Sequence, residues 1–317
     1  MKKSLRLFTL LSLLFATIAG YAITVPTLTE VWKHTTGLPK NENARQGAMY
    51  GGKMYILNRV DNEIKVWDET GMVETIKTTG GGAGINFDEV GNMVVRSENF
   101  SGNAVSKSYT IYSKSDNYVT TKKLTITNVE GRADYIGKIA GDILSNGGGH
   151  MCCAVATVNN FYDHYIVNGV EDEKQKKTFT STIANDATTI VYPFGKYYIL
   201  HKRNDAILQL DELGNKTELK TPDKGTTCGS DVFILNGTTY VVYGTDKKDY
   251  KDGFSIADQT SGKVVASHNG IGTIRPASAT ANWLYVEKVS DFKVNIFQYN
   301  PENIIAKYTF EVPNPYV

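Results

Sequence analysis

Cysteine, proline and net charge are all scarce in this sequence. Its 317 residues include 3 Cys and 8 Pro, and 34 Lys and Arg against 33 Asp and Glu leave a formal net charge of +1. So few cysteines cannot build a disulfide framework. Cys152 and Cys153 are adjacent, and neighbouring side chains on a strand point to opposite faces, so a bond between them would be strained. The sequence leaves open a bond from either of them to Cys228.

The even charge and the missing motifs exclude several classes of function. Phosphate binding needs clustered basic residues, which a net charge of +1 does not indicate. The five histidines share no metal-ligand spacing, and no Gly-x-Ser-x-Gly motif marks a nucleophile. The Gly-rich segment Thr79–Gly84 lacks the Gly-Lys-Ser/Thr ending and the following helix of a phosphate-binding loop. We therefore predict no nucleic-acid partner, no metal site and no cofactor.

Long apolar runs are missing too, except at the amino terminus. Basic residues precede the apolar stretch Leu7–Ile18, and Gly20 and Ala22 place small residues before a cleavage point. We expect Met1–Ala22 to be a signal peptide cleaved after Ala22, with no lipoprotein cysteine following it. A retained membrane anchor is the alternative, although the run is short for a span. The mature chain is expected to be secreted, periplasmic or on the cell surface, with no later membrane span.

No stretch shows a helical period, but one segment recurs. Gly52–Thr78 reads GKMYILNRVDNEIKVWDETGMVETIKT, and Gly195–Thr221 reads GKYYILHKRNDAILQLDELGNKTELKT, at a constant shift of 195 − 52 = 143 residues. The copies share the opening Gly-Lys, a Tyr-Ile-Leu run, an Asp-Glu turn and the closing Lys-Thr. A repeat that keeps its register over this length indicates that the chain is built from equivalent structural units.

Each copy reads as short antiparallel strands joined by tight turns. A glycine turn opens it, and three strands follow, separated by an Asn/Asp turn and an Asp-Glu-x-Gly turn. A short strand before the glycine turn, Ala48–Tyr50 or Thr189–Tyr192, completes a four-stranded unit. Such a unit of roughly 40–50 residues has the size of a propeller blade. The apolar content of 41% can fill a large β core.

Six units of this size fill the mature chain, 23–317, which we predict to be one all-β domain. We expect Asp134–Ile139 to be the inner strand of the third unit. In the sixth unit we expect Ala277–Ala281 as the inner strand and Trp283–Val289 as the second. The strands Thr29–Thr35 and Ile304–Val312 both look outermost, so we expect them to share one blade and to close the ring.

This pattern of turns and repeats resembles uncharacterised secreted bacterial six-bladed β-propellers, in general pattern TolB-like and NHL-like. The resemblance runs from about residue 27 to residue 317 and implies a β-propeller of six four-stranded blades. It rests on no diagnostic motif, so it transfers no functional residue. Seven blades, or a pair of β-sandwiches, are the alternatives.

The propeller architecture implies a mouth of the channel lined by two sets of loops. These are the loops that lead into the inner strands and the loops between the second and third strands. The candidate ligand-binding residues on these loops are Arg45, Arg132, Asp134, Asp186, Asp231, Arg275, Phe100 and Tyr250. The arginines present fixed forks of donors to an anionic or carbonyl-bearing ligand, unless each pairs with a carboxylate of a neighbouring blade. The two aromatic residues stand in polar loops where a sugar ring could stack, unless their exposure is incidental.

No catalytic constellation is visible in the sequence, and repeated loops around a rigid ring suit binding. We therefore predict a non-catalytic, monomeric binding module that recognises a glycan or a protein at the channel mouth. One alternative is a propeller hydrolase, lyase or lactonase, which requires a metal or a carboxylate cluster at the mouth. The other is a structural surface domain, which predicts a mouth filled by its own side chains.

Overall fold

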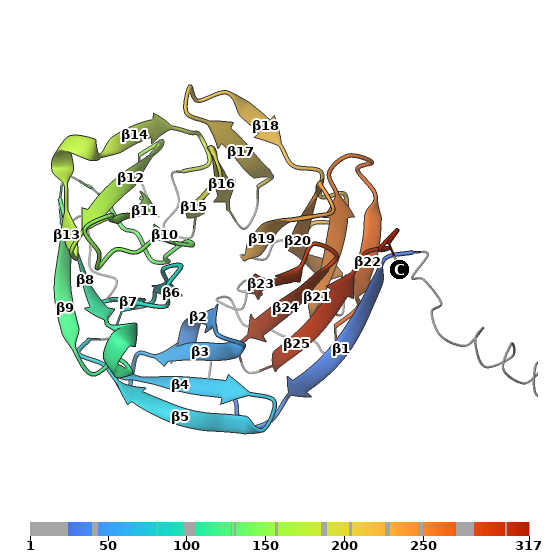
Figure 1. Ribbon diagram of the computed structural model, residues 1–317, viewed down its shortest axis with the longest axis horizontal. Coiled ribbons are helices and arrows are strands. Elements are labelled where there is room, and N and C mark those ends of the chain that lie inside the picture. Colours follow the sequence, from blue (N-terminus) through green and yellow to red (C-terminus); the bar gives the residue numbers. More distant parts are fainter. Residues whose placement is uncertain are drawn as a thin grey trace, which may run out of the picture.

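The computed structural model shows an all-β chain of six antiparallel sheets arranged around a central axis (Figure 1). It describes residues 25–39, 44–80, 82–97, 106–127, 129, 131–155, 158–184, 189–202, 205–225, 229–247, 250–270, 282–301 and 303–316. The predicted six-bladed β-propeller is therefore confirmed, and the seven-bladed and sandwich alternatives are wrong. The predicted signal peptide lies outside the described residues.

The first three blades follow one another along the chain, and the strands of each blade run outward from the axis in sequence order. Blade 1 consists of β2 (Ala44–Tyr50), β3 (Lys53–Asn58), β4 (Glu63–Asp68) and β5 (Gly71–Lys77). Blade 2 consists of β6 (Ile85–Phe87), β7 (Met93–Arg96), β8 (Lys107–Tyr112) and β9 (Thr121–Ile126), with the short 3-10 helix η1 (Lys114–Asp116) before β9. Blade 3 consists of β10 (Ala140–Gly141), β11 (Gly149–Ala154), β12 (Asn160–Val167), β13 (Val170–Glu171) and β14 (Lys177–Thr180), with η2 (Glu173–Gln175) before β14.

The last three blades complete the ring. Blade 4 consists of β15 (Ile190–Phe194), β16 (Tyr197–His201), β17 (Ile207–Asp211) and β18 (Lys216–Glu218). Blade 5 consists of β19 (Ser230–Leu235), β20 (Thr238–Lys247), β21 (Tyr250–Asp258) and β22 (Val264–His268). Blade 6 consists of β23 (Trp283–Ser290), β24 (Lys293–Asn300), β25 (Ile304–Glu311) and the amino-terminal strand β1 (Thr27–His34).

The two ends of the described chain meet in blade 6, as the sequence predicts. Strand β1 pairs antiparallel with β25, from Thr27 opposite Glu311 to His34 opposite Ile305. Figure 1 shows β1, in blue, lying along β25, in red. This pairing gives hydrogen-bond partners to the outer backbone groups of β25 and closes the ring. The ring can therefore open between the two ends of the chain only if the hydrogen bonds between β1 and β25 break.

The repeated residues have the same structural roles in blade 1 and blade 4. Ile64 and Ile207 are both fully buried. The Asp68 carboxylate accepts a hydrogen bond from the backbone amide of Thr70 at 2.8 Å, and the Asp211 carboxylate accepts one from the amide of Leu213 at 2.9 Å. These aspartates therefore shape turns, which is the role that the sequence predicts for the repeated Asp-Glu pairs.

One predicted inner strand and one predicted strand position are wrong. In blade 3 the inner ladder is only Ala140–Gly141, and residues 134–139 run beside the axis without forming a strand. In blade 6 β23 is the inner strand, whereas Trp283–Val289 was expected to be the second strand. The expected inner strand Ala277–Ala281 lies outside the described residues. Inner and second strands carry similar apolar patterns, because both are covered on each face by neighbouring blades.

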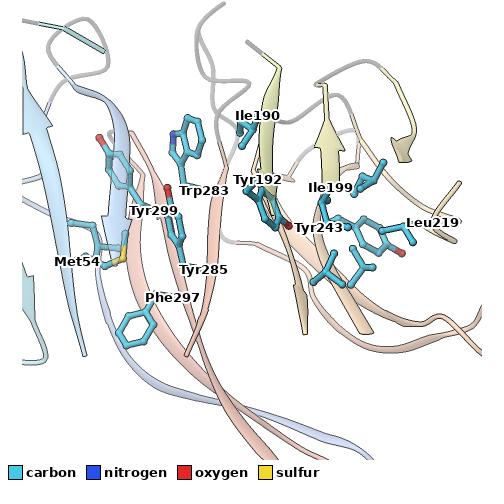
Figure 2. Packing of buried hydrophobic residues seen from close by; sticks show 14 of the residues in the cluster. Met54, Ile190, Tyr192, Ile199, Leu219, Tyr243, Trp283, Tyr285, Phe297 and Tyr299 are labelled. Atoms are coloured by element: carbon cyan, nitrogen blue, oxygen red, sulfur yellow. The ribbon is translucent and has the colours of Figure 1, made fainter. Parts of the chain in front are cut away.

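A cluster of buried side chains joins the inner strands around the axis. Trp283 and Tyr285 of β23 lie in one cluster with Ile190 and Tyr192 of β15 (Figure 2). Trp283 is only 2% exposed, and its ring contacts Tyr135 edge-on at a centroid distance of 4.8 Å. Aromatic packing of this kind fixes the inner strands and so gives rigid support to whatever lies at either end of the axis.

Candidate ligand-binding site at the axis

The middle of the axis is packed by the protein's own polar side chains. Gln46 is 1% exposed, and its side-chain oxygen accepts hydrogen bonds from the backbone amides of Ile85 and Ile136, both at 3.1 Å. Its side-chain nitrogen donates to the carbonyl of Ile136 at 2.7 Å. The remaining cavity here measures about 20 Å³, which is room for about one water molecule. This cavity is therefore too small for a ligand such as a sugar.

A buried ion pair lies beside this packed region. Asp231 is 0% exposed, and its carboxylate lies 2.5 Å from the Lys138 ammonium and accepts a hydrogen bond from the Val286 amide at 2.7 Å. Burial raises the pKa of Asp231 above its ordinary value, although the Lys138 charge and these hydrogen bonds oppose that rise. Asp231 thus joins blades 3, 5 and 6.

A wide bowl opens at the end of the axis where the inner strands finish, which we call the carboxyl face. Its volume is about 640 Å³, within the range of pockets that hold small molecules. Blades 1, 2, 3, 4 and 6 all contribute to it. Its lining residues are Met49, Tyr50, Asn86, Phe87, Asp88, Glu89, Lys138, Ile139, Ala140, Pro193, Phe194, Gly195, Tyr285, Val286 and Lys288.

The aromatic side chains of the bowl are held in place by the turns that follow the inner strands. Tyr50 stacks on Phe87 at a centroid distance of 5.3 Å and donates a hydrogen bond from its hydroxyl to the Val90 carbonyl at 2.9 Å. Phe194 is half-buried at the end of β15 and packs against the axial cluster. Both rings therefore keep part of their surface exposed to a ligand while their positions are fixed.

The polar groups of the bowl differ in how far they are already engaged. Asp88 is 3% exposed, and burial raises its pKa, but its oxygens accept hydrogen bonds from the Asn92 amide at 2.7 Å and the Ile143 amide at 3.2 Å. Asp88 thus shapes a turn. Lys138 pairs with Asp231 but leaves 39% of its side chain exposed, Lys288 is exposed and pairs with Asp291 at 2.7 Å, and Glu89 is exposed. These last three groups can meet a ligand's hydroxyl or carboxylate groups.

Three of the site residues predicted from the sequence, Arg45, Arg132 and Asp134, lie at the other end of the axis, which we call the amino face. Arg132 holds Asp134 with two hydrogen bonds, at 2.7 and 2.6 Å. Burial, and after it the charge of Arg45, lowers the pKa of Arg59. The Arg45 carbonyl accepts a hydrogen bond from the Trp283 indole at 2.7 Å, and Trp283 packs against Tyr135, which follows Asp134 in the chain. These contacts place the Arg45 backbone close to the segment that contains Arg132 and Asp134.

Of the other predicted site residues, Asp231 is not brought to that region, because it is buried within the axis and engaged by Lys138. Tyr250 lies on β21, and nothing is described of its side chain. Asp186, Arg275 and Phe100 lie outside the described residues. Among the predicted site residues whose side chains are described, none lines the bowl.

Sequence reasoning missed the aromatic residues of the bowl. Tyr50 and Phe194 directly precede Gly51 and Gly195, in the glycine turns that open the two repeat copies. From the sequence alone, those turns are interpreted only as connections between strands. At the 143-residue shift Tyr50 aligns with Pro193 and Phe194 with Gly51, so the two aromatic residues are not equivalent positions of the repeat. The signal that could have identified this face is the presence of an aromatic residue just before a glycine of the opening turn in each copy.

Three further observations bear on chemistry and on likeness to known proteins. Among the described residues, no group of three or more His, Cys, Asp or Glu side chains is placed to hold a metal ion. Within the same residues, no helix is long and apolar enough to cross a membrane. No family model matches the chain, and no curated protein is similar to it in sequence.

Solved structures do resemble this fold. A DUF4623 family protein from Bacteroides eggerthii DSM 20697 superposes with a TM-score of 0.63 at 15% identity, over 93% of this chain and 77% of that chain. BBS1N, in a complex with ARL6DN, superposes with a TM-score of 0.52 at 11% identity, over 91% of this chain and 97% of that one. A streptogramin B lyase gives a TM-score of 0.47 at 12% identity, over 91% and 89% of the two chains. The superpositions on the DUF4623 family protein and on BBS1N show a shared fold, and at 15% and 11% identity they show nothing about function.

Proposed function

We propose that this protein is an exported, non-catalytic binding module that holds a glycan in the bowl of the carboxyl face. The observation that carries the proposal is the bowl itself, a cavity of about 640 Å³ to which residues from blades 1, 2, 3, 4 and 6 contribute. Support for export comes from the signal-peptide pattern of Met1–Ala22.

The lining of the bowl matches the chemistry of a sugar. A pyranose ring has apolar C–H faces, which pack on aromatic rings such as Tyr50 and Phe194, and equatorial hydroxyls, which need charged or polar partners at its edge. Lys138 and Lys288 supply donors and Glu89 supplies an acceptor. Because Tyr50, Phe194 and Lys288 stand on inner strands around a packed axis, little ordering is needed when a ligand binds.

The other functions predicted from the sequence receive less support. Glycoside hydrolysis generally uses a pair of carboxyl groups, but the two carboxylates that line the bowl are Asp88, whose oxygens hold a turn, and the exposed Glu89. A purely structural domain predicts a filled mouth, whereas the bowl on the carboxyl face is open. A protein partner usually covers a surface of about 800 Å², which is broader than this concave site.

The test uses the mature chain from Ile23 and a panel of glucose, mannose, galactose and galacturonic acid oligomers. Thermal shift identifies the glycans that stabilise the folded state, since a ligand at about 100 times its Kd adds about 2.7 kcal/mol. Isothermal titration then compares wild type with Phe194→Ala. Phe292→Ala is the matched control, because Phe292 packs in another cluster, against blade 6, and does not line the bowl.

We expect at least one panel glycan to bind, Phe194→Ala to weaken it about tenfold, which corresponds to about 1.4 kcal/mol, and Phe292→Ala to leave the affinity unchanged. If no glycan of the panel binds, the proposal is contradicted. Equal binding by wild type and Phe194→Ala contradicts the placement in the bowl. Binding that is lost in Arg45→Ala alone would move the site to the amino face.

A further inference from the structure

A second depression continues the bowl outward between blades 1 and 2. It measures about 400 Å³, and Tyr50 lines both spaces. Besides Tyr50, its side chains come from Lys53, Tyr55, Glu74, Lys114 and Tyr118. We call this depression the groove. It is a direct extension of the bowl on the same face, and Tyr50 forms the ridge between the two.

Tyr50 is fixed firmly enough to act as that ridge. Its ring stacks on Phe87, and its hydroxyl is held by the Val90 carbonyl. Gly91 passes directly beneath the ring with φ of 93°, and a Cβ atom there would lie 2.3 Å from Cζ of Tyr50. Only glycine therefore allows both this backbone conformation and this position of the ring.

The far end of the groove contains backbone strain. Asn117 and Tyr118 have φ values of 57° and 69°, so two successive residues with side chains adopt the left-handed conformation. For a residue as bulky as tyrosine this conformation is unfavourable. It is maintained by a hydrogen bond from the Tyr118 amide to the Ser113 carbonyl at 2.8 Å and by the Asp116 carboxylate, which accepts from the Thr120 amide at 2.9 Å. Strain of this kind is commonly found at sites of function.

The strained turn places a polar surface in the groove. The Lys114 side chain is exposed, and its ammonium lies 5.3 Å from the centre of the buried Tyr118 ring. Lys53 and Lys114 supply hydrogen-bond donors, and Glu74 supplies an acceptor. The groove thus offers lysine and glutamate groups as the bowl does, and the half-buried Tyr50 is the aromatic ring that the two spaces share.

We propose that the ligand is an extended oligosaccharide that runs from the bowl over Tyr50 into the groove, and that the groove is a second sugar-binding subsite. This inference rests on the proposed glycan-binding function. A polymer of sugar rings presents the same faces and hydroxyls at each residue, so it can satisfy two similar depressions in sequence, whereas a monosaccharide can occupy one.

The experiment measures affinity against chain length for homo-oligomers of one to six sugars, using the sugar type that binds in the panel. We expect the affinity to rise about tenfold or more between the monosaccharide and the longer oligomers and then to level off. A tenfold rise corresponds to the free energy of about one hydrogen bond to a charged group. In Lys114→Ala the ratio of oligomer to monosaccharide affinity should fall towards one. Lys263→Ala, an exposed lysine in a turn of blade 5, is the control and should preserve the ratio.

The outcomes separate this inference from the proposed function. If no glycan of any length binds, the proposed function and the inference both fail. If monosaccharide and oligomers bind equally well, or if Lys114→Ala preserves the gain in affinity with oligomer length, the bowl remains the site and the hypothesis that the groove is a subsite is wrong. Oligomers of glucose and of galacturonic acid, compared at low and high salt, distinguish a neutral glycan from an acidic one, because screening weakens only the acidic one substantially.

Discussion

Replacing Gln46 by alanine removes the side chain that holds three blades together at the axis. The buried amides of Ile85 and Ile136 then lose their acceptor, while the Ile136 carbonyl keeps the Asn86 side-chain amide at 3.0 Å. A buried donor without a partner costs about 1–3 kcal/mol. With two such donors, and one water molecule able to enter the space, we expect Gln46→Ala to lower the free energy of unfolding by about 3 kcal/mol.

Equilibrium urea unfolding followed by tryptophan fluorescence measures this loss, with the half-buried Gln209 of β17 as the matched control for alanine substitution. The Gln46→Glu variant tests the direction in which stability changes with pH. A buried carboxylate has its pKa raised, so this variant should approach wild-type stability below about pH 4.3, where both states are protonated, and lose stability as pH rises above that value. A loss below about 1 kcal/mol for Gln46→Ala, or a Gln46→Glu variant that is insensitive to pH, would refute the axial role.

Three further predictions follow from other parts of the fold. Deleting β1 exposes the edge of β25, so the protein should form aggregates in size-exclusion chromatography and melt at a lower temperature than wild type. Burial raises the pKa of Asp163, but hydrogen bonds from His150 and Tyr198 outweigh it and lower the pKa below 3.8. The ionised Asp163 carboxylate therefore stabilises the folded state above that value, and this stabilisation is lost as the pH falls further. In urea unfolding titrations between about pH 5 and pH 2, Asp163→Asn should lose less stability with falling pH than wild type. Gly91→Ala forces a side chain into Tyr50 and should lower the free energy of unfolding by about 1–3 kcal/mol in the same assay, an expectation that unchanged stability would contradict.

The blades could be predicted because each is a local unit with its own signals. Glycine turns, alternating strands and the copy of Gly52–Thr78 at Gly195–Thr221 all act over short distances along the chain. The closure of the ring by β1 could also be predicted, because a closed propeller avoids an exposed sheet edge. The short inner ladder at Ala140–Gly141 could not be predicted, since its two residues carry no pattern.

The axial contacts could not be predicted because their partners are far apart in the sequence. Gln46 binds Ile136 across 90 positions, and Asp231 engages Val286 across 55. The bowl arises in the same way, from the ends of inner strands in different blades. Sequence reasoning chose the amino face because a propeller is expected to line one mouth with the loops that enter the inner strands and the loops between the second and third strands. The cavity of the carboxyl face is instead built from the ends of inner strands and the turns that follow them.

The measurement that tests the central claim most directly is isothermal titration of the best-binding panel glycan into wild type, Phe194→Ala and Arg45→Ala. These two variants each remove one large side chain from opposite ends of the axis. If the bowl holds the glycan, Phe194→Ala should weaken binding about tenfold and Arg45→Ala should change it less than about twofold. The reverse order of effects, or equal binding by all three proteins, would contradict the account.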